Sequence, residues 1–195
     1  MERKYLYSNW GYKLVNLALP SGKLGCDREL GAQASNDNNY NYIYFWGETL
    51  TNKAGSYTYY PGENATLSND QDIAYILTGG KLRIPTRAEL TELWNYCTKT
   101  FISITTLTGG TVMGLRFTGA NGNYIDIEFA GYLGNWGANF WDEIMFIRAR
   151  DGDYCMVWNC GGYSPGDVLT SSIILTSDYR VPHNYRLHIM PIQYT

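Results

Sequence analysis

The stretch GGKLRIPTRAELTELWNYC, residues 79–97, carries the clearest structural signals in this sequence. Thr86 and Glu89 have the spacing of a capping box, in which each side chain accepts a hydrogen bond from the other residue's backbone N–H. Pro85 stands directly before the cap and marks where the helix begins. Apolar side chains then recur at helical spacing, at Leu90, Leu93, Trp94 and Cys97. The stretch therefore predicts an amphipathic helix over residues 86–97.

Strand patterns dominate the rest of the chain. A shorter helix is expected over residues 70–78, ending at Gly79 and Gly80. Alternating apolar and polar residues around Asn-Gly and Asp-Gly turns predict hairpins. The expected strands cover residues 12–19, 42–48, 115–119, 123–132, 143–150, 153–159, 171–176 and 185–192, with a polar loop at 34–41 and a long surface loop at 49–69. Two early helices followed by strands predict an α+β domain with the helices packed on irregular antiparallel sheets.

Composition narrows the class of protein. A chain of 195 residues, 45% of them apolar, fits one domain with a sizeable core. Charged residues make up 17% and the net charge is -3, so no basic surface is expected to attract nucleic acid. The 18 tyrosines, 6 tryptophans and 21 glycines, with many Asn, Ser and Thr, supply turns, aromatic faces and adaptable hydrogen bonds. Antibody paratopes are enriched in a similar set of residue types.

Neither a membrane span nor a secretory signal is expected. No segment approaches the ~20 consecutive apolar residues of a membrane-crossing helix. The opening MERKYLYSNWGYKLVNLALPSG lacks an apolar run before a small-residue cleavage site. If Met1 is native, the protein is made in the cytosol and either stays there or leaves by lysis or inside a particle. If Met1 is not native, an extracellular or cell-surface location remains open.

The cysteines do not have the spacing of a metal site. Their irregular positions and the absence of paired C-x-x-C knuckles argue against zinc. A cytosolic start favours free, partly buried thiols, although an even count leaves disulfides open. The four residues are Cys26, Cys97, Cys155 and Cys160.

Several segments, in their order, resemble one family and are spread over nearly the whole chain. They are LPSGKL (19–24), DRELGA (27–32), FWGET (45–49), GGKLRIPTRAELTELWNYC (79–97), FTGANGNYIDIEFAGY (117–132) and YRLHIMPI (185–192). The most specific element is GGK-x-R-x-PT-x-x-E-x-x-x-L. The chain resembles the C-type-lectin-fold domains of gut Bacteroidota surface proteins, of the FISUMP type, and the variable proteins of diversity-generating retroelements, which phages often carry.

The resemblance implies a single C-type-lectin-like domain over residues 1–195. Residues 1–133 would form a scaffold, 134–185 a ligand-facing region and 186–195 a closing strand. The chain departs from the family most beyond residue 133. It has Gly25 where the family usually has tryptophan, Phe140-Trp141-Asp142-Glu143 where the family has YWSS, and LHIMPI in place of a Val-Arg-Pro-Val ending.

Recognition is therefore expected between residues 134 and 185, where aromatic and amide side chains are interleaved. Aromatic rings cover the apolar face of a sugar or bury area at a protein contact, and amides fix orientation. Trp141 and Trp158 are expected to be buried, whereas Tyr163, Tyr179 and Tyr185 lie in Gly, Pro and Asn contexts that favour exposure. The candidate ligand-binding residues are Asn135, Trp136, Asn139, Tyr154, Asn159, Tyr163, Ser164, Tyr179, Arg180, His183, Asn184 and Tyr185.

Metal and catalytic chemistry have weaker signals. The Glu-Pro-Asn, Gln-Pro-Asp and Trp-Asn-Asp tripeptides of calcium-dependent lectins are absent, so no calcium or other cofactor is expected. Turn-edge acids are interpreted as solvated; they are Asp142, Glu143, Asp151, Asp153 and Asp167. Cys155 and Cys160 have the spacing of the cysteine pair of formylglycine-generating enzymes, but that family's surrounding sequence is missing. His183 and His188 fit no catalytic or metal spacing, so no catalytic residue is expected.

These observations favour a non-enzymatic recognition module on the surface of a phage virion, such as a head fibre, which attaches to a bacterial surface glycan or protein. Other virion proteins are expected partners. A homo-oligomer is expected too, with a trimer favoured, because weak contacts add through effective concentration. The alternatives are a structural capsid or fibre decoration protein, a secreted Bacteroidota surface adhesin and, least favoured, a formylglycine-generating-type oxidase.

Overall fold

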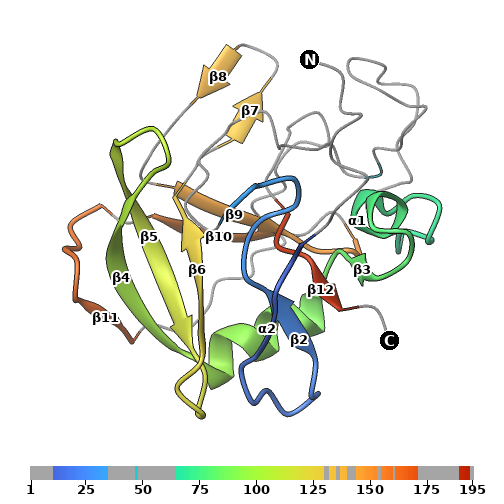
Figure 1. Cartoon of the computed structure of the whole chain (residues 1–195), viewed down its shortest axis with the longest axis horizontal. Coiled ribbons are helices and arrows are strands. Elements are labelled where there is room, and N and C mark those ends of the chain that lie inside the picture. Colours follow the sequence, from blue (N-terminus) through green and yellow to red (C-terminus); the bar gives the residue numbers. More distant parts are fainter. Residues whose placement is uncertain are drawn as a thin grey trace.

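The computed structural model describes residues 11–34, 47, 65–129, 132–134, 137–139, 144–152, 155–159, 161–170 and 189–193. Within these residues the chain has an α+β architecture, with two helices and two antiparallel four-stranded sheets (Figure 1). The predicted fold class is confirmed at this level. Two further pairs of strands form separate two-stranded ladders: β7 (Tyr132–Gly134) with β8 (Gly137–Asn139), and β9 (Ile144–Arg148) with β10 (Cys155–Asn159).

The first sheet joins the two ends of the described chain. Its order is β1-β2-β12-β3, formed by β1 (Leu14–Asn16), β2 (Leu24–Cys26), β12 (Ile192–Gln193) and β3 (Leu82–Arg83). Ile192 pairs with Gly25 on one side and with Arg83 on the other. Just before β12, the carbonyl of Ile189 accepts a hydrogen bond from Leu30. The last described strand therefore lies between segments from the first half of the chain.

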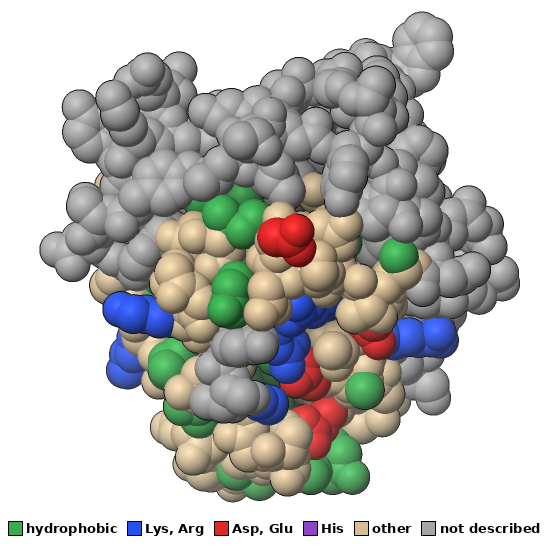
Figure 2. All heavy atoms as spheres, turned by 90° about the vertical axis from the view of Figure 1, so that its right-hand side faces the viewer, with side chains coloured by type: hydrophobic (Ala, Val, Ile, Leu, Met, Phe, Trp, Pro, Cys, Tyr) green, Lys and Arg blue, Asp and Glu red, His purple; other side chains and the backbone are tan. Residues whose placement is uncertain are grey.

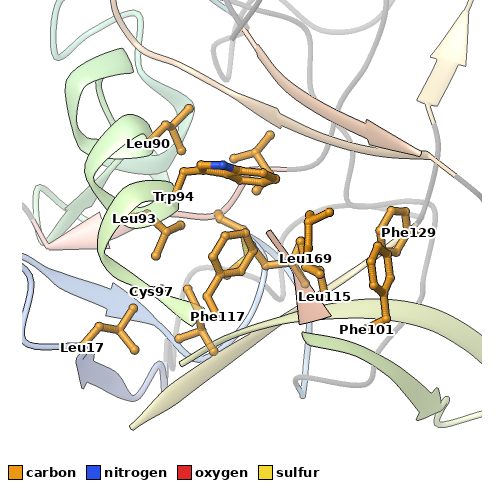
Figure 3. Close-up of a cluster of buried hydrophobic side chains, with 14 of the residues drawn as sticks. Leu17, Leu90, Leu93, Trp94, Cys97, Phe101, Leu115, Phe117, Phe129 and Leu169 are labelled. Carbon is orange, nitrogen blue, oxygen red and sulfur yellow. The ribbon is translucent and has the colours of Figure 1, made fainter. Parts of the chain in front are cut away.

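The second sheet provides one wall of the main core. Its order is β11-β4-β5-β6, formed by β4 (Thr98–Thr105), β5 (Thr111–Thr118), β6 (Tyr124–Glu128) and β11 (Val168–Leu169). Phe101, Leu115 and Ile127 lie opposite one another in the register and are all buried. This inward face packs against helix α2 (Arg87–Tyr96) (Figure 3). Trp94 of α2 meets Phe117 of β5 edge to face, with ring centroids 6.0 Å apart.

Helix α2 is held at its start in the way that residues 79–97 predict. Thr86 is the N-cap, and both hydrogen bonds of the capping box with Glu89 are present. The Arg83 guanidinium also contacts Glu89 through two hydrogen bonds of 2.8 and 2.6 Å. The Asp151 carboxylate, far along the chain, accepts a hydrogen bond from the backbone N–H of Arg87. Three residues of the GGK-x-R-x-PT-x-x-E motif thus form one network at the helix N-terminus.

Helix α1 (Ile73–Leu77) is shorter than predicted, because Asp72 is its N-cap and the helix begins three residues after the expected start. It ends before Gly79 and Gly80, as predicted, and both glycines have positive φ, at 60° and 82°. Its buried side chains form a second core cluster, consisting of Leu30, Leu67, Ile73, Ala74, Leu77, Ile84 and Ile189.

The described end of the expected surface loop, residues 65–69, belongs to no helix or strand and exposes Thr66 and Ser68, but it also contributes one residue to the core. Leu67 is buried in the second cluster, and Thr66 bridges to Asp151. Arg150 donates a 2.8 Å hydrogen bond to the carbonyl of Leu67 and a 2.7 Å bond to Asn69. These partners lie more than 80 residues away along the chain, which is why local polarity alone suggested a loop.

Both predicted hairpins are present, with different limits. β5 and β6 pair around Gly122, but β5 begins at Thr111, and Tyr132 belongs to the next strand, β7. Glu128, at the end of the alternating pattern, is buried. β9 and β10 pair antiparallel as expected. The strand expected over 12–19 spans only Leu14–Asn16, and among the described residues 189–193 the closing strand is Ile192–Gln193.

Other predicted elements fall largely outside the described residues. These are the strands at 42–48, where only Gly47 is described and lies in a turn, and at 171–176, the polar loop at 35–41, and residues 185–188 of the closing strand. In the described part of the chain, neither helix is long and apolar enough to cross a membrane. Figure 2 shows the face that carries α1 and β3, on which described acidic and basic side chains are interspersed.

At Gly119 and Gly25 the backbone lies close to another segment of the chain, but the space for a side chain differs. A Cβ on Gly119 would lie 2.0 Å from the carbonyl oxygen of Leu17, whereas a Cβ on Gly25 would meet Ile125 at 3.7 Å. Gly119→Ala is expected to lower the free energy of unfolding by about 1–3 kcal/mol, because the backbone of Leu17 must move. Gly25→Ala is expected to be neutral or to stabilise by up to about 1 kcal/mol. Urea unfolding of both variants checks this, and equal losses would contradict the described packing.

The network at α2 should give the stability a pH dependence. Desolvation raises the pKa of Glu89, but hydrogen bonds from Arg83 and Thr86 outweigh it and hold the pKa below its ordinary value of 4.5. A lowered folded-state pKa contributes stability above the unfolded pKa, and this contribution is lost as the pH falls through the folded value. Glu89→Gln should therefore cost about 1–3 kcal/mol at neutral pH. Chemical denaturation from pH 7 to pH 3 should show this difference shrinking below pH 4.5.

The matched control is Glu92→Gln, which alters a partly exposed carboxylate of the same helix that contacts Ser21. We expect a smaller loss of stability in this variant. A Glu89→Gln loss that stays constant across the acid range would contradict the network.

Candidate functional site

Only part of the predicted ligand-facing region, residues 134–185, belongs to the described part of the chain. Among the predicted binding residues, Tyr163 and Ser164 have described side chains. Asn139 and Asn159 are described only as the last residues of β8 and β10. The remaining predicted residues lie outside the described part of the chain, namely Asn135, Trp136, Tyr154, Tyr179, Arg180, His183, Asn184 and Tyr185.

Residues 161–167, the Tyr163 loop, lie along the edge of β4 and lead into β11. The backbone N–H of Gly166 donates to the carbonyl of Phe101 at 2.7 Å, and Phe101 donates to the carbonyl of Asp167 at 2.9 Å. The pairing continues as Val168 with Thr100. The loop is thus an extension of the second sheet rather than a segment detached from it.

The tip of this loop closes on itself. Asp167 donates its backbone N–H to the carbonyl of Ser164 at 3.0 Å, and its carboxylate accepts the N–H of Ser164 at 2.7 Å. Gly162 and Gly166 take φ values of 85° and 98°, which favour glycine. These constraints give the exposed loop a defined backbone, which lowers the entropy that a partner would have to remove on binding.

Tyr163 is exposed, as predicted, and one side of its ring covers the core. Its ring lies 4.3 Å from that of Phe101, at 15°, and Phe101 is fully buried. Phe101 in turn stacks on Phe129 at 5.9 Å. Tyr163 retains 39% exposure. The residue therefore combines a structural contact with an available aromatic surface. Sequence context alone could not distinguish these two roles.

Next to this loop, a groove crosses the outer face of the second sheet, the face opposite the main core. The register places Val168, Thr100, Arg116 and Asp126 in one row across β11, β4, β5 and β6. The lining mixes polar and apolar groups; it consists of Thr100, Phe101, Ile102, Ser103, Ile104, Thr105, Arg116, Asp126, Pro165 and Gly166.

Arg116 and Asp126 form a bidentate ion pair in the groove. Arg116 Nε lies 2.7 Å from Asp126 Oδ1, and Nη2 lies 2.8 Å from Oδ2. The guanidinium carbon lies 3.7 Å from the centroid of the Tyr124 ring. The hydrogen bond to Asp126 raises the pKa of Arg116 above its usual range. The pair thus has a fixed geometry and carries no net charge.

Sequence reasoning did not select Arg116 or Asp126, although one signal could have located them. The predicted turn at Ala120-Asn121-Gly122 implies that Thr118 pairs with Tyr124 and Arg116 with Asp126, as observed. Charged residues on the polar side of a strand were interpreted only as part of an alternating pattern. The register of the hairpin, rather than residue type, reveals the pair.

The described residues give little support for a reactive thiol or a metal centre. Cys26 and Cys97 are free, as predicted, but more fully buried than expected, and burial raises the pKa of their thiols to about 12 and about 11. Such thiols are poor nucleophiles near neutral pH. Cys155 lies in β10, whereas Cys160 lies outside the described residues.

The two turn-edge acids that are described accept backbone hydrogen bonds. The Asp151 carboxylate binds the start of α2, and the Asp167 carboxylate binds Ser164. Within the described part of the chain, no three His, Cys, Asp or Glu residues gather as metal ligands. Both acids therefore have structural roles that account for their positions.

Comparisons with models of protein families, with curated proteins and with solved structures found no match to this chain. The Tyr163 loop and the groove therefore stand on their own geometry as the candidate binding surface.

The Tyr163 contact predicts a graded loss of stability. Tyr163→Ala should lower the free energy of unfolding by about 1–3 kcal/mol, because it uncovers Phe101 and removes a stacked pair. Tyr163→Phe keeps the ring and should stay within about 0.5 kcal/mol of the natural chain. Thermal and urea unfolding measure both changes. Equal stability of all three proteins would show that the ring does not cover Phe101.

Proposed function

We propose that this chain is a non-enzymatic recognition module of C-type-lectin-like fold, which binds a glycan or protein on a bacterial surface. The observation that carries the proposal is Tyr163, a partly exposed ring fixed on the buried Phe101 at the tip of a hydrogen-bonded loop. Rigid aromatic side chains provide contact area at little entropic cost, which is why they recur in binding surfaces.

Two features of the scaffold support the C-type-lectin-like part of the proposal. Residues of the most specific motif, Arg83, Thr86 and Glu89, act together at the start of α2, so the motif has a structural purpose. The strand near the C-terminal end, β12, lies beside β2 near the N-terminal end. Such a closed frame can present loops without changing its own packing.

We place the module on the surface of a phage virion, attached to other virion proteins and assembled as a homo-oligomer, with a trimer as the expected state. The resemblance to variable proteins that phages often carry supports this setting. Several copies on one particle would multiply weak individual contacts. The high pKa values of the Cys26 and Cys97 thiols agree with a function that does not depend on their reactivity.

A cell-binding experiment tests the proposal. The labelled protein should bind Bacteroidota cells and their extracted surface polysaccharide in a pull-down. Tyr163→Leu keeps an apolar side chain over Phe101 but removes the ring face, and should weaken binding by about tenfold or more. Tyr96→Leu is the matched control, because Tyr96 is 60% exposed on α2, in the scaffold. Circular dichroism should show both variants folded.

Two results would oppose the proposal. Absence of binding to any cell or polysaccharide tested, together with absence of the protein from virions by mass spectrometry, would overturn it. Particles that fall apart with Tyr163→Leu, but adsorb normally while intact, would instead assign the structural decoration role.

A further inference from the structure

We infer that the groove on the outer face of the second sheet binds a neutral sugar unit, with Arg116 and Asp126 as its polar contacts. The inference rests on the proposed recognition function and names a ligand class for it. Three properties of the groove carry it, namely its hydrogen-bonding groups, its charge and its fixed geometry.

The ion pair leaves hydrogen-bonding capacity on both partners. A guanidinium has five N–H donors, and an ionised carboxylate can accept about four hydrogen bonds. Arg116 uses Nε and Nη2 toward Asp126, one bond to each carboxylate oxygen. The side chains keep 35% and 17% of their exposure. Adjacent donors and acceptors of this kind match neighbouring sugar hydroxyls, each of which both donates and accepts.

The charge of the groove favours a neutral ligand. Arg116 and Asp126 neutralise one another, and the other lining residues are uncharged. An anionic ligand would have to approach Asp126, and a cationic one Arg116, so either would gain little net attraction. Ile102, Ile104 and Pro165 add apolar surface to the lining, which suits the C–H faces of a sugar ring.

The polar contacts are held in place before any ligand arrives. Tyr124 stacks on the guanidinium and acts as a positioning residue, and the pairing of β5 with β6 sets Arg116 opposite Asp126. Pro165 and Gly166 form the rim, and the hydrogen bond from Gly166 to Phe101 ties that rim to β4. Such preorganisation reduces the cost of binding a weak ligand.

NMR titration of the whole chain tests the inference. The probes are the methyl glycosides of glucose, galactose and mannose, together with N-acetylglucosamine and the acidic methyl glucuronide. At least one neutral probe should give saturable shifts at the amides of Thr100, Arg116 and Asp126. The glucuronide should bind the natural protein no more tightly than that neutral probe does.

Variants separate binding from a merely structural ion pair. Arg116→Lys keeps the positive charge beside Asp126 but loses the paired N–H donors of the guanidinium. It should weaken binding of the neutral probe by about tenfold or more. Asp126→Asn leaves Arg116 uncompensated, so the preference should move toward the glucuronide. Thr100→Ala, inside the groove, should weaken binding, whereas Thr98→Ala, exposed on the same face of β4 but outside the groove, should not.

The inference is overturned if no neutral probe gives saturable shifts in the groove, or if Arg116→Lys binds as the natural protein does. Cell binding that survives Arg116→Lys but not Tyr163→Leu would remove the groove from recognition and leave the proposed function intact. Sugar binding in the groove without any cell binding would support the groove as a sugar site and oppose the proposed function. Thermal unfolding should show that each variant stays folded.

Discussion

The buried carboxylate of Asp72 is the interaction on which the scaffold depends. It accepts backbone hydrogen bonds from Tyr75 at the start of α1 and from Ile84 after β3, at 3.1 and 3.0 Å, and lies 3.5 Å from Arg150. Burial raises its pKa, although these contacts oppose the shift. A buried acid is tolerated only where its oxygens are satisfied, so the segments that satisfy it must come together.

Arg150 extends this arrangement toward the rest of the molecule. Its guanidinium reaches the carbonyl of Leu67, its backbone N–H donates to Pro85, and its neighbour Asp151 binds the start of α2. Helix α2 then leads directly into β4, whose Lys99 donates a 2.7 Å hydrogen bond back to the carbonyl of Trp94. β4 contains Phe101, and the Tyr163 loop is hydrogen-bonded to its edge. The candidate surface is thus connected, through α2 and β4, to the contacts around Asp72.

The structure explains which parts of the site could be predicted. Glycine and proline around Tyr163 indicated an exposed loop, because these residues favour turns whatever surrounds them. Its partner Phe101 was missed because β4 follows α2 at once, with no Gly or Pro to mark the boundary. Arg116 and Asp126 come together in the candidate groove only because two strands pair in register beside Pro165, which residue type alone does not reveal.

The sequence by itself determined the features that act over a few residues: the capping box of α2, the glycine end of α1, and the β5–β6 and β9–β10 hairpins. Their signals are local because backbone geometry and short-range hydrogen bonds decide them. Only the tertiary structure decided that Leu67 is buried, that the Asp151 carboxylate binds the start of α2 and that Tyr163 rests on Phe101. Each of these depends on partners more than sixty residues away along the chain, and their meeting reflects the packing of the whole domain.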